Sequence, residues 1–385
     1  MKALDRKLLR DLLRLWAQSL AVAVVMACGV ATLVLSLGTW RSLEETRTAY
    51  YERYRFGDVF ASAVRVPRAL VDQVATIDGV AGIEARITEP FLLDIEGMRE
   101  PASGIAISLP PGNDPAVNAL YLRDGRLPEM TRANEVAISA GFAEAHGFGV
   151  GSRFTGQFGS AKVTLTVVGI VLSPEYVYAV GPGDMMPDNR HFGVVWMPEE
   201  TLAALYDLDG AFNALSLMLL PGTSRAAVID EIDRLLEPYG GTGAIERKDQ
   251  LSNAFIDSEL TQLRGMAVLI PPVFLLVSAF LINMILSRLV ALEREQIGLL
   301  KALGYGRTAV VWHYLKLVLV VAVIGIVLGS GVGTWLGRGM TVMYARFYSF
   351  PFLIFRSSPD MYLIAAGVTV AAAVLGAFQA SRAVF

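Results

Sequence analysis

Four long apolar runs restrict the folds that this sequence can adopt. A helix needs about 20 apolar residues to cross the roughly 30 Å hydrocarbon core of a bilayer. Of the 385 residues, 54% are hydrophobic and 18% are charged, whereas soluble domains carry about 25% charged residues. The sequence therefore predicts an integral membrane protein with four transmembrane helices. The runs cover residues 17–38, 265–286, 317–336 and 361–378.

The first run also has features of a signal peptide, because a basic segment precedes it. The residues around Cys28 loosely resemble a lipoprotein cleavage box. However, the apolar run continues for ten residues beyond Cys28, which favours a retained helix over residues 17–40. Cys28 is the only cysteine of the chain, so an intramolecular disulfide is excluded.

Lys and Arg residues in short flanks predict the orientation, because they favour the cytoplasmic side. The amphipathic segment 1–16 and the loop 287–316 are both basic. Three arginines in the loop 337–360 are a weaker contrary signal. We expect both termini, including residues 379–385, to lie in the cytoplasm. The basic residues that carry this prediction are Lys2, Arg6, Lys7, Arg10 and Arg14, followed by Arg288, Arg294, Lys301, Arg307 and Lys316.

Residues 41–264 are too long for a loop and predict a domain outside the cytoplasm. They hold 31 Asp and Glu against 19 Lys and Arg, a net charge of −12, which argues against nucleic-acid binding. Their two ends, 41–55 and 251–264, contain good helix formers and predict helical stalks that continue the first and second spans.

Between the stalks, alternating apolar patches predict strands. A strand–helix–strand unit near residues 58–97 is followed by a similar unit at 213–247. We expect one α+β subdomain built from both ends of the segment, with an insertion at about 100–205. The predicted fold class is thus an integral membrane α-helical protein with a large α+β extracytoplasmic domain between helices 1 and 2.

The sequence contains no catalytic constellation, no metal-ligand spacing and no phosphate-binding loop of the GxxxxGK[ST] type. Asp184 and Asp188 flank a Gly/Pro-rich loop and could bind a cation, although solvated carboxylates are commoner in such loops. His146, His191 and His313 lie in three different contexts. We therefore predict no catalytic residue, no metal and no cofactor in this chain. If nucleotide energy is used, another chain binds the nucleotide.

Two features of the spans bear on helix packing. Gly325, Gly329, Gly333 and Gly337 recur every four residues in the third span. Such a face lets helix backbones approach closely, either within one chain or between two, although glycine is common in membrane helices. The pair Pro271-Pro272 near the outer end of the second span predicts a bend, which could be a flexible joint or a static kink.

The stretch LEREQIGLLKALGYGR, residues 292–307, has a helical pattern between two spans. Its apolar residues exceed what a free loop needs: Leu292, Ile297, Leu299, Leu300 and Leu303. Glu293, Arg294, Glu295 and Lys301 would keep the other side hydrated. Such a helix either lies on the membrane surface or docks into a groove of a partner. Its nearly balanced charge favours docking.

This stretch resembles the segment after the second span of MacB/FtsX-type ABC transporter permeases, R-x-E-I-G-x-L-[KR]-A-L-G. Gln296 stands where that family most often has Glu. The matching residues are Ile297, Gly298, Leu300, Lys301, Ala302, Leu303 and Gly304. The stretch GRLPEMTRANEVAISAGFAEAHGFGVGSRF also resembles the outer domain of the family, and LTVVGIV resembles the strand that follows. The order of span, outer domain and three spans covers the whole chain.

The resemblance implies a multi-pass permease subunit of the bacterial inner (plasma) membrane that couples ATP hydrolysis to movements of its outer domain, exporting or extracting a hydrophobic or lipid-like substrate. It implies a cytoplasmic ABC ATPase that binds ATP-Mg, a second permease subunit (homodimer, heterodimer or duplicated half), membrane lipid, and a periplasmic membrane-fusion protein or hydrolase. One alternative is a non-transporting regulator of a periplasmic partner such as a cell-wall hydrolase. Another is an unrelated membrane receptor. The coupling helix would include Leu292, Glu293, Arg294, Gln296, Ile297, Leu299, Leu300, Lys301, Leu303 and Gly304.

Overall fold

The computed structural model describes residues 3–184 and 186–382. The predicted basic residue Lys2 lies outside them, as do the side chains of residues 3–6, 9, 300, 301, 307, 346, 381 and 382. The chain divides into two compact units. A helical unit comprises Met1–Glu44, Leu260–Met343 and Ile354–Phe385, and an α+β unit comprises Glu45–Glu259 and Tyr344–Leu353.

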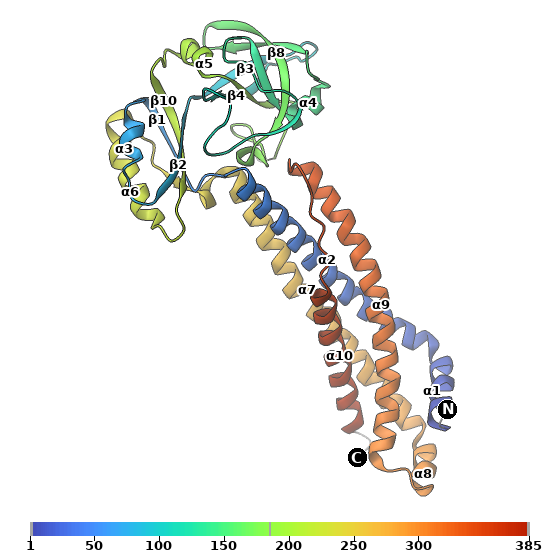
Figure 1. The fold of residues 1–385 in the computed structure, drawn as a ribbon. Coiled ribbons are helices and arrows are strands. Elements are labelled where there is room, and N and C mark those ends of the chain that lie inside the picture. The colour runs from blue at the N-terminus through green and yellow to red at the C-terminus, as the bar shows by residue number, and fades with distance from the viewer. Residues whose placement is uncertain (1–2, 185, 383–385) are drawn as a thin grey trace. The chain divides into compact units, whose positions relative to one another are not determined.

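Long helices make up the helical unit, and four of those described are long and apolar enough to cross a membrane. Figure 1 shows these four, α2, α7, α9 and α10, running side by side. With an α+β domain between the first and the second, the predicted fold class is confirmed. The helices are α1 Ala3–Arg14, α2 Trp16–Arg53, α7 Leu251–Leu292, α8 Arg294–Ala302, α9 Arg307–Phe347 and α10 Pro359–Arg382.

Three of these helices extend well beyond the apolar runs. The helix α2 continues without a break to Arg53, and α7 begins at Leu251, so both predicted stalks are helical. The helix α9 runs to Phe347, which corrects the prediction of a loop from residue 337. The physical reason is that no proline interrupts the chain before Pro351, so nothing stops the helix earlier. The helix α7 also remains helical through Pro271 and Pro272, and a bend there stays a prediction.

The predicted glycine face of α9 lies against α2 of the same chain. A Cβ atom placed on Gly329 would lie 2.6 Å from the carbonyl oxygen of Ala27, and one on Gly333 would lie 2.7 Å from that of Ala31. Contact distances this short leave no room for a side chain, so the two backbones approach closely only because glycine stands at these positions. The contact at Gly337 is looser, since a Cβ there would lie 3.6 Å from the nearest atom.

The α+β unit contains a four-stranded antiparallel sheet built from both ends of its sequence. Its strand order is β11-β1-β10-β2. Buried apolar residues of β1 and β10 pack with Val228, Ile232 and Leu236 of α6 to form its core. The elements are β1 Val59–Pro67, α3 Leu70–Val74, β2 Val80–Arg86, β10 Ala211–Leu219, α6 Arg225–Leu236, η2 Glu237–Tyr239, β11 Ile245–Glu246 and η3 Arg247–Asp249.

The remaining strands form a seven-stranded sheet of order β5-β8-β6-β9-β4-β3-β7, and β7 also pairs with β8. This extra pairing closes six of the strands into a barrel and leaves β5 attached to β8. The elements are β3 Thr88–Asp94, β4 Ala102–Leu109, β5 Tyr121–Gly125, β6 Glu135–Ser139, α4 Ala140–His146, β7 Arg153–Phe158, β8 Ala161–Leu172, η1 Pro174–Tyr176, β9 Phe192–Pro198 and α5 Glu199–Tyr206.

The barrel begins at Thr88, earlier than the expected insertion at about residue 100. Residues 85–97, expected to form the last strand of the unit near residues 58–97, are divided, because β2 joins the four-stranded sheet and β3 joins the barrel. The chain passes between the sheets at Ile87, which is fully buried. No glycine or proline marks this point in the sequence, so the break could not be read from turn residues.

A buried ion pair, Arg86–Glu175, links the end of β2 to the segment after β8. Arg86 donates two hydrogen bonds to Glu175, and both side chains are buried. Burial alone lowers the pKa of Arg86, but the adjacent carboxylate of Glu175 outweighs it and the pKa is raised overall. Arg86 therefore stays charged, and its stability in the interior depends on Glu175.

We predict that Glu175→Gln destabilises the α+β unit by about 3–5 kcal/mol, because removing one partner leaves a buried charge without compensation. The control is Glu144→Gln, whose partner Arg123 is in an exposed pair that contributes about 0–1 kcal/mol. Urea unfolding of the detergent-solubilised chain, followed by near-UV circular dichroism, measures both. Equal midpoints for the two variants would contradict the assigned role of the buried pair.

We also predict that Gly329→Ala lowers the unfolding temperature of the helical unit, since its Cβ would lie 2.6 Å from a backbone oxygen of α2. Overpacking of this kind typically costs about 1–3 kcal/mol. Gly331→Ala, on the same helix, is the matched control, because no atom lies within 4 Å of a Cβ built there. Thermal unfolding in detergent should separate the two variants. If both melt like the parent chain, the close contact between α2 and α9 is not a stabilising one.

Candidate docking site at the α7–α8–α9 connection

The short helix α8 begins and ends at identifiable points. It covers Arg294–Ala302, so the helix predicted across residues 292–307 is shorter than expected. Leu292 belongs to α7, and Gly304 has a φ of +91°, a left-handed conformation that commonly ends helices. The amide of Leu303 still bonds to the carbonyl oxygen of Leu299 at 3.0 Å, so Leu303 continues the last turn of the helix.

One side of this connection exposes leucines, and the opposite side is buried. The side chains of Leu292, Leu299 and Leu303 are between 63% and 70% exposed. Leu299 and Leu303 are four residues apart and therefore share a face. We call these three residues the leucine face. Ile297, in contrast, is buried in the core of the helical unit beside Val310.

The other residues predicted for the docking helix are also divided into exposed and buried ones. Arg294 and Glu295 are exposed, as expected, and Gln296 and Gly304 are exposed as well. Glu293 was expected on the hydrated side, but it is only 4% exposed, which corrects that prediction. The physical reason is that its carboxylate accepts hydrogen bonds from Lys7 and Tyr314, which replace its contacts with water. The side chains of Leu300 and Lys301 lie outside the described residues.

A buried polar cluster lies behind α8. Lys7 Nζ on α1 lies 2.7 Å from Glu293 Oε2 and 2.8 Å from Asp11 Oδ2. The hydroxyl of Tyr314, on α9, donates to the same Glu293 oxygen at 2.9 Å. His313 Nε2 lies 3.3 Å from Asp11 Oδ2. We call these five residues the polar cluster.

The electrostatics of the cluster favour a charged Lys7. Burial lowers the pKa of Lys7, but its hydrogen bonds to Asp11 and Glu293, and the charges of these two carboxylates, raise it above its ordinary value overall. The lysine therefore remains an ammonium that can hold both carboxylates at once. A neutral amine would leave two buried negative charges without a cation at hydrogen-bond distance.

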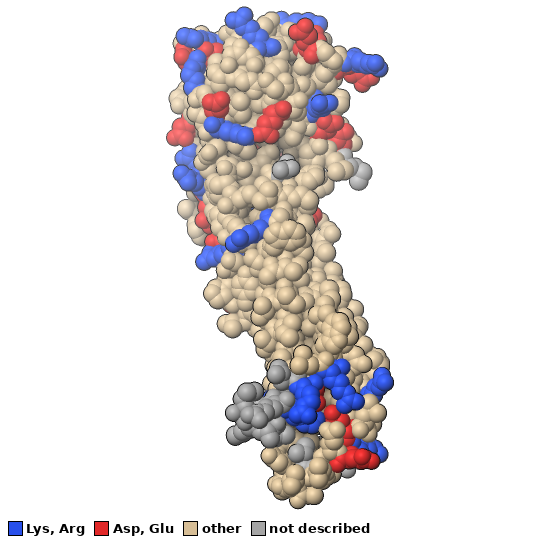
Figure 2. Space-filling view, turned by 90° about the vertical axis from the view of Figure 1, so that its right-hand side faces the viewer, with Lys and Arg blue, Asp and Glu red and all other residues tan. Residues whose placement is uncertain are grey.

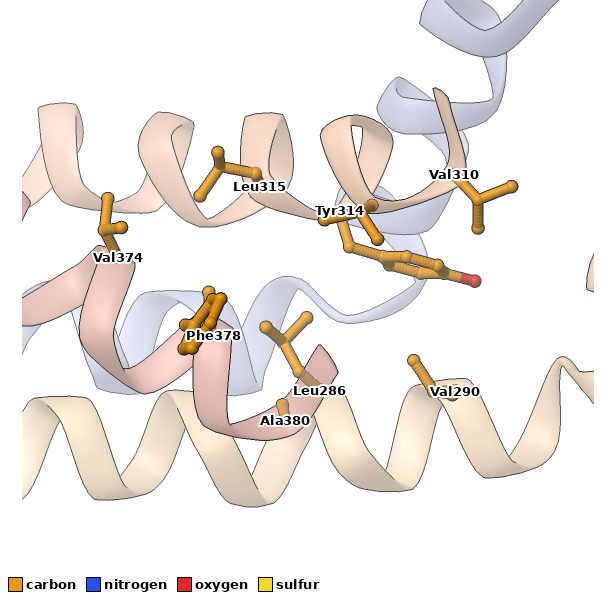
Figure 3. Close-up of a pocket in the computed structure, with 10 residues that line it drawn as sticks. Leu286, Val290, Val310, Tyr314, Leu315, Val374, Phe378 and Ala380 are labelled. Atoms are coloured by element: carbon orange, nitrogen blue, oxygen red, sulfur yellow. The ribbon is translucent and has the colours of Figure 1, made fainter. Parts of the chain in front are cut away.

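A small apolar cavity of about 90 Å³ lies next to the cluster, between α7, α9 and α10 (Figure 3). Leu286 and Val290 on α7, Val310 on α9 and Phe378 on α10 contribute to its wall. The ring of Tyr314 forms part of the lining, and its hydroxyl is the one that bonds to Glu293. This lining can hold a few methylene groups, and it offers little that would orient a polar substrate.

Comparisons with known proteins identify the chain. Residues 19–235 match the MacB-like periplasmic core domain, and residues 268–385 match the FtsX-like permease C-terminal domain. The chain belongs to the MacB/FtsX-like ABC transporter permease family. The resemblance seen in the sequence is thereby confirmed. Permeases of this family are generally not enzymes themselves.

Individual relatives of this permease are more distant. An uncharacterised ABC transporter permease protein of Mycobacterium tuberculosis (strain ATCC 25618 / H37Rv) is 25% identical over 211 residues. The match spans 55% of this chain and 23% of that protein, so the chain aligns with about a quarter of the length of its relative.

Two solved structures are also similar to part of the permease. The extracellular domain of the noncanonic ABC-type transporter YknZ from Gram-positive bacteria is 12% identical, with a TM-score of 0.34, and the match covers 49% of this chain and 98% of that one. The periplasmic region of MacB from Actinobacillus actinomycetemcomitans is 9% identical, with the same TM-score, over 56% and 96% of the two chains. The family assignment rests on the two domain matches.

The surface of the permease agrees with a membrane protein. On the face drawn in Figure 2, a long stretch of the helical unit carries no charged residue, and charged side chains gather at the end that holds α1 and α8. Apolar side chains such as Leu269, Leu276 and Leu363 are largely exposed along the helices. In a soluble protein an apolar surface this extensive would be unusual.

Other residues that the sequence singled out form no site in the described residues. In the Gly/Pro-rich loop, Asp188 Oδ2 pairs with His191 Nδ1 at 2.8 Å, and this hydrogen bond lowers the pKa of Asp188. Within residues 3–184 and 186–382, no three His, Cys, Asp or Glu side chains come together as metal ligands. His146 contacts the carbonyl oxygen of Arg190.

Sequence reasoning missed the polar cluster. Lys7 was interpreted only as a topology signal, and His313 only as an isolated histidine. The available signal was weak: Asp11 interrupts a leucine-rich segment, and His313-Tyr314 lie at the start of a long apolar run, where polar residues commonly have a specific partner. Their partners are distant in the chain, since Lys7 and Glu293 are 286 positions apart.

Proposed function

We propose that this chain is the permease subunit of an ABC transporter and that a separate cytoplasmic ATPase docks on α8. ATP hydrolysis in that ATPase, which would bind ATP-Mg, would drive movements of the α+β domain and thereby export or extract a hydrophobic or lipid-like substrate. The observation that carries the proposal is the leucine face, which is exposed within the region that matches the FtsX-like permease C-terminal domain.

The energetics favour an apolar contact at this site. Burying one leucine side chain is worth about 1.5–3 kcal/mol, whereas an exposed ion pair contributes about 0–1 kcal/mol. The three leucines could therefore supply most of the binding free energy, and Arg294 and Glu295 at the margin would tune specificity. No nucleotide-binding motif is present in the sequence, which supports a partner chain as the site of hydrolysis.

The continuity of α9 supports the mechanical part of the proposal. This helix runs from Arg307, just after α8, to Phe347, and the residues that follow belong to the α+β unit. There the ring of Tyr348 lies 5.4 Å from that of Tyr178, and the amide of Ser349 donates to the carbonyl oxygen of Val177 at 2.8 Å. A shift of α9 along its axis would therefore pull on the α+β domain directly.

An apolar groove supports the proposed substrate class and the second subunit. It has a volume of about 470 Å³ and lies between α7 and α10, with Leu276, Phe280 and Leu375 among its lining residues. A lipid-like molecule or a helix of a second permease subunit would suit these side chains. A periplasmic membrane-fusion protein would fit the export role, and a periplasmic hydrolase would fit the regulatory alternative, in which the same movement acts on a partner without transport.

We predict that Leu303→Asp abolishes co-purification of the ATPase, because a charge would enter an apolar contact. Most of the ATP hydrolysis that the permease stimulates should be lost with it. The measurement is ATPase retention and hydrolysis in nanodiscs, after size-exclusion chromatography has established that the permease is folded. Leu220→Asp, an equally simple change at an exposed leucine of the α+β unit, is the control. Wild-type retention by Leu303→Asp would mean that α8 is not the docking element.

The proposed orientation predicts different labelling of the two sides. In a Cys28→Ser background, a cysteine at Asp209 in the α+β unit should react with an impermeant maleimide on intact spheroplasts. A cysteine at Gln296 on α8 should react only after the membrane is permeabilised. Both positions are exposed in the structure, so burial does not explain a difference. Equal labelling of both positions before permeabilisation would contradict the orientation.

A further inference from the structure

Burying the charged groups of the polar cluster is energetically unfavourable, and docking on the leucine face does not require the cluster. Two carboxylates, Asp11 and Glu293, are about 6% and 4% exposed and share one lysine. Moving charges out of water is strongly unfavourable, and apolar residues often replace such clusters without loss of stability. A cluster of this kind is therefore better explained by the geometry that it imposes than by the stability that it adds.

That geometry is centred on a single oxygen atom. Glu293 is the residue between α7 and α8, and its Oε2 accepts from Lys7 of α1 at 2.7 Å and from Tyr314 of α9 at 2.9 Å. Hydrogen bonds of this kind are directional, so they restrict both the position of the junction and the rotation of the helix that starts there. Contacts from α1 and α9 thus meet at the junction between α7 and α8.

Ile297, one turn further along α8, also restricts the rotation of this helix. Its amide bonds to the carbonyl oxygen of Glu293 at 2.9 Å, and its side chain is buried in the core. With Glu293 and Ile297 held inward, the leucine face has to point outward. The inward and outward faces of α8 are therefore set by one polar and one apolar anchor on adjacent turns.

We propose that α1 is a positioning element for α8: Lys7, through Glu293, holds the leucine face in the orientation that transmits force between the docked ATPase and α9. The inference rests on the proposed function and adds to it a role for the N-terminal helix. Lys7, Glu293 and Tyr314 are positioning residues and not docking residues. Removing the Lys7–Glu293 pair should leave the leucine face able to bind the ATPase but unable to transmit movement efficiently.

The test compares four variants of the full chain with the wild type, each co-expressed with its ATPase and studied in nanodiscs. Lys7→Met and Glu293→Gln remove one charge each with little change in shape. The double variant Lys7→Glu/Glu293→Lys exchanges the two charges and can restore the pair. Arg10→Met, at an exposed position of the same helix, is the matched control. The readouts are ATPase retention and permease-stimulated hydrolysis, with Leu303→Asp as the reference for lost docking.

We expect Lys7→Met and Glu293→Gln to retain the ATPase and to lose at least five-fold in stimulated hydrolysis. The exchange variant should recover at least half of the wild-type value, and Arg10→Met should match the wild type. Wild-type stimulation in both single variants, while Leu303→Asp loses docking, would overturn the inference and leave the proposed function intact. No effect of Leu303→Asp would overturn the proposed function instead.

The inference can still be tested if one single variant misfolds. If Lys7→Met fails to assemble, the exchange variant decides, because a purely structural need for apolar packing would not be met by two exchanged charges. An exchange variant that folds and binds the ATPase but remains uncoupled would overturn the inference. So would a loss of ATPase retention that equals that of Leu303→Asp in both single variants, since that would place Lys7 and Glu293 in the docking contact itself.

Discussion

Hydrocarbon surroundings require that every backbone N–H and C=O group finds a partner within the protein, and the helical unit follows from this constraint. Long, uninterrupted helices satisfy it along the chain. Between helices the apolar medium gives no hydrophobic driving force, so association depends on close packing. The approach of α9 to α2 at Gly329 and Gly333 provides such packing. It fixes α9 against α2, so that a helix linking α8 to the α+β domain has a rigid support.

In the proposed docking, the two faces of α8 contribute through different kinds of interaction. The leucine face is apolar and non-directional, so it can bind strongly while tolerating small rotations of a partner. The polar cluster is directional, and it determines which way that face points. A docking helix attached only by apolar contacts could bind an ATPase and still slip when the ATPase moves. Force transmission would require both strong binding through the leucine face and a fixed orientation imposed by the polar cluster.

The sequence predicted the spans, the fold class and the family because each depends on local pattern: apolar length, strand alternation and the stretch around Ile297-Gly298. It did not predict the burial of Glu293. A charged residue beside a predicted surface helix is usually hydrated, and its partners Lys7 and Tyr314 are brought close only by the tertiary fold. The division of strands at Ile87 was missed for a similar reason, because β2 and β3 join different sheets through strands distant in the chain, β10 and β7 respectively.

The end of α9 packs inside the α+β unit. Residues 344–353 comprise the last turn of α9 and the six residues after it, and they pack within that unit. Aromatic contacts such as Tyr178–Tyr348 replace there the glycine packing used along the spans. Within the unit, Arg86 and Glu175 tie the four-stranded sheet to the barrel. Because Tyr178 lies three residues beyond Glu175 in the chain, a pull on residues 344–353 would act next to this buried pair. The pair would then keep the two sheets from separating, so that the domain responds as one body.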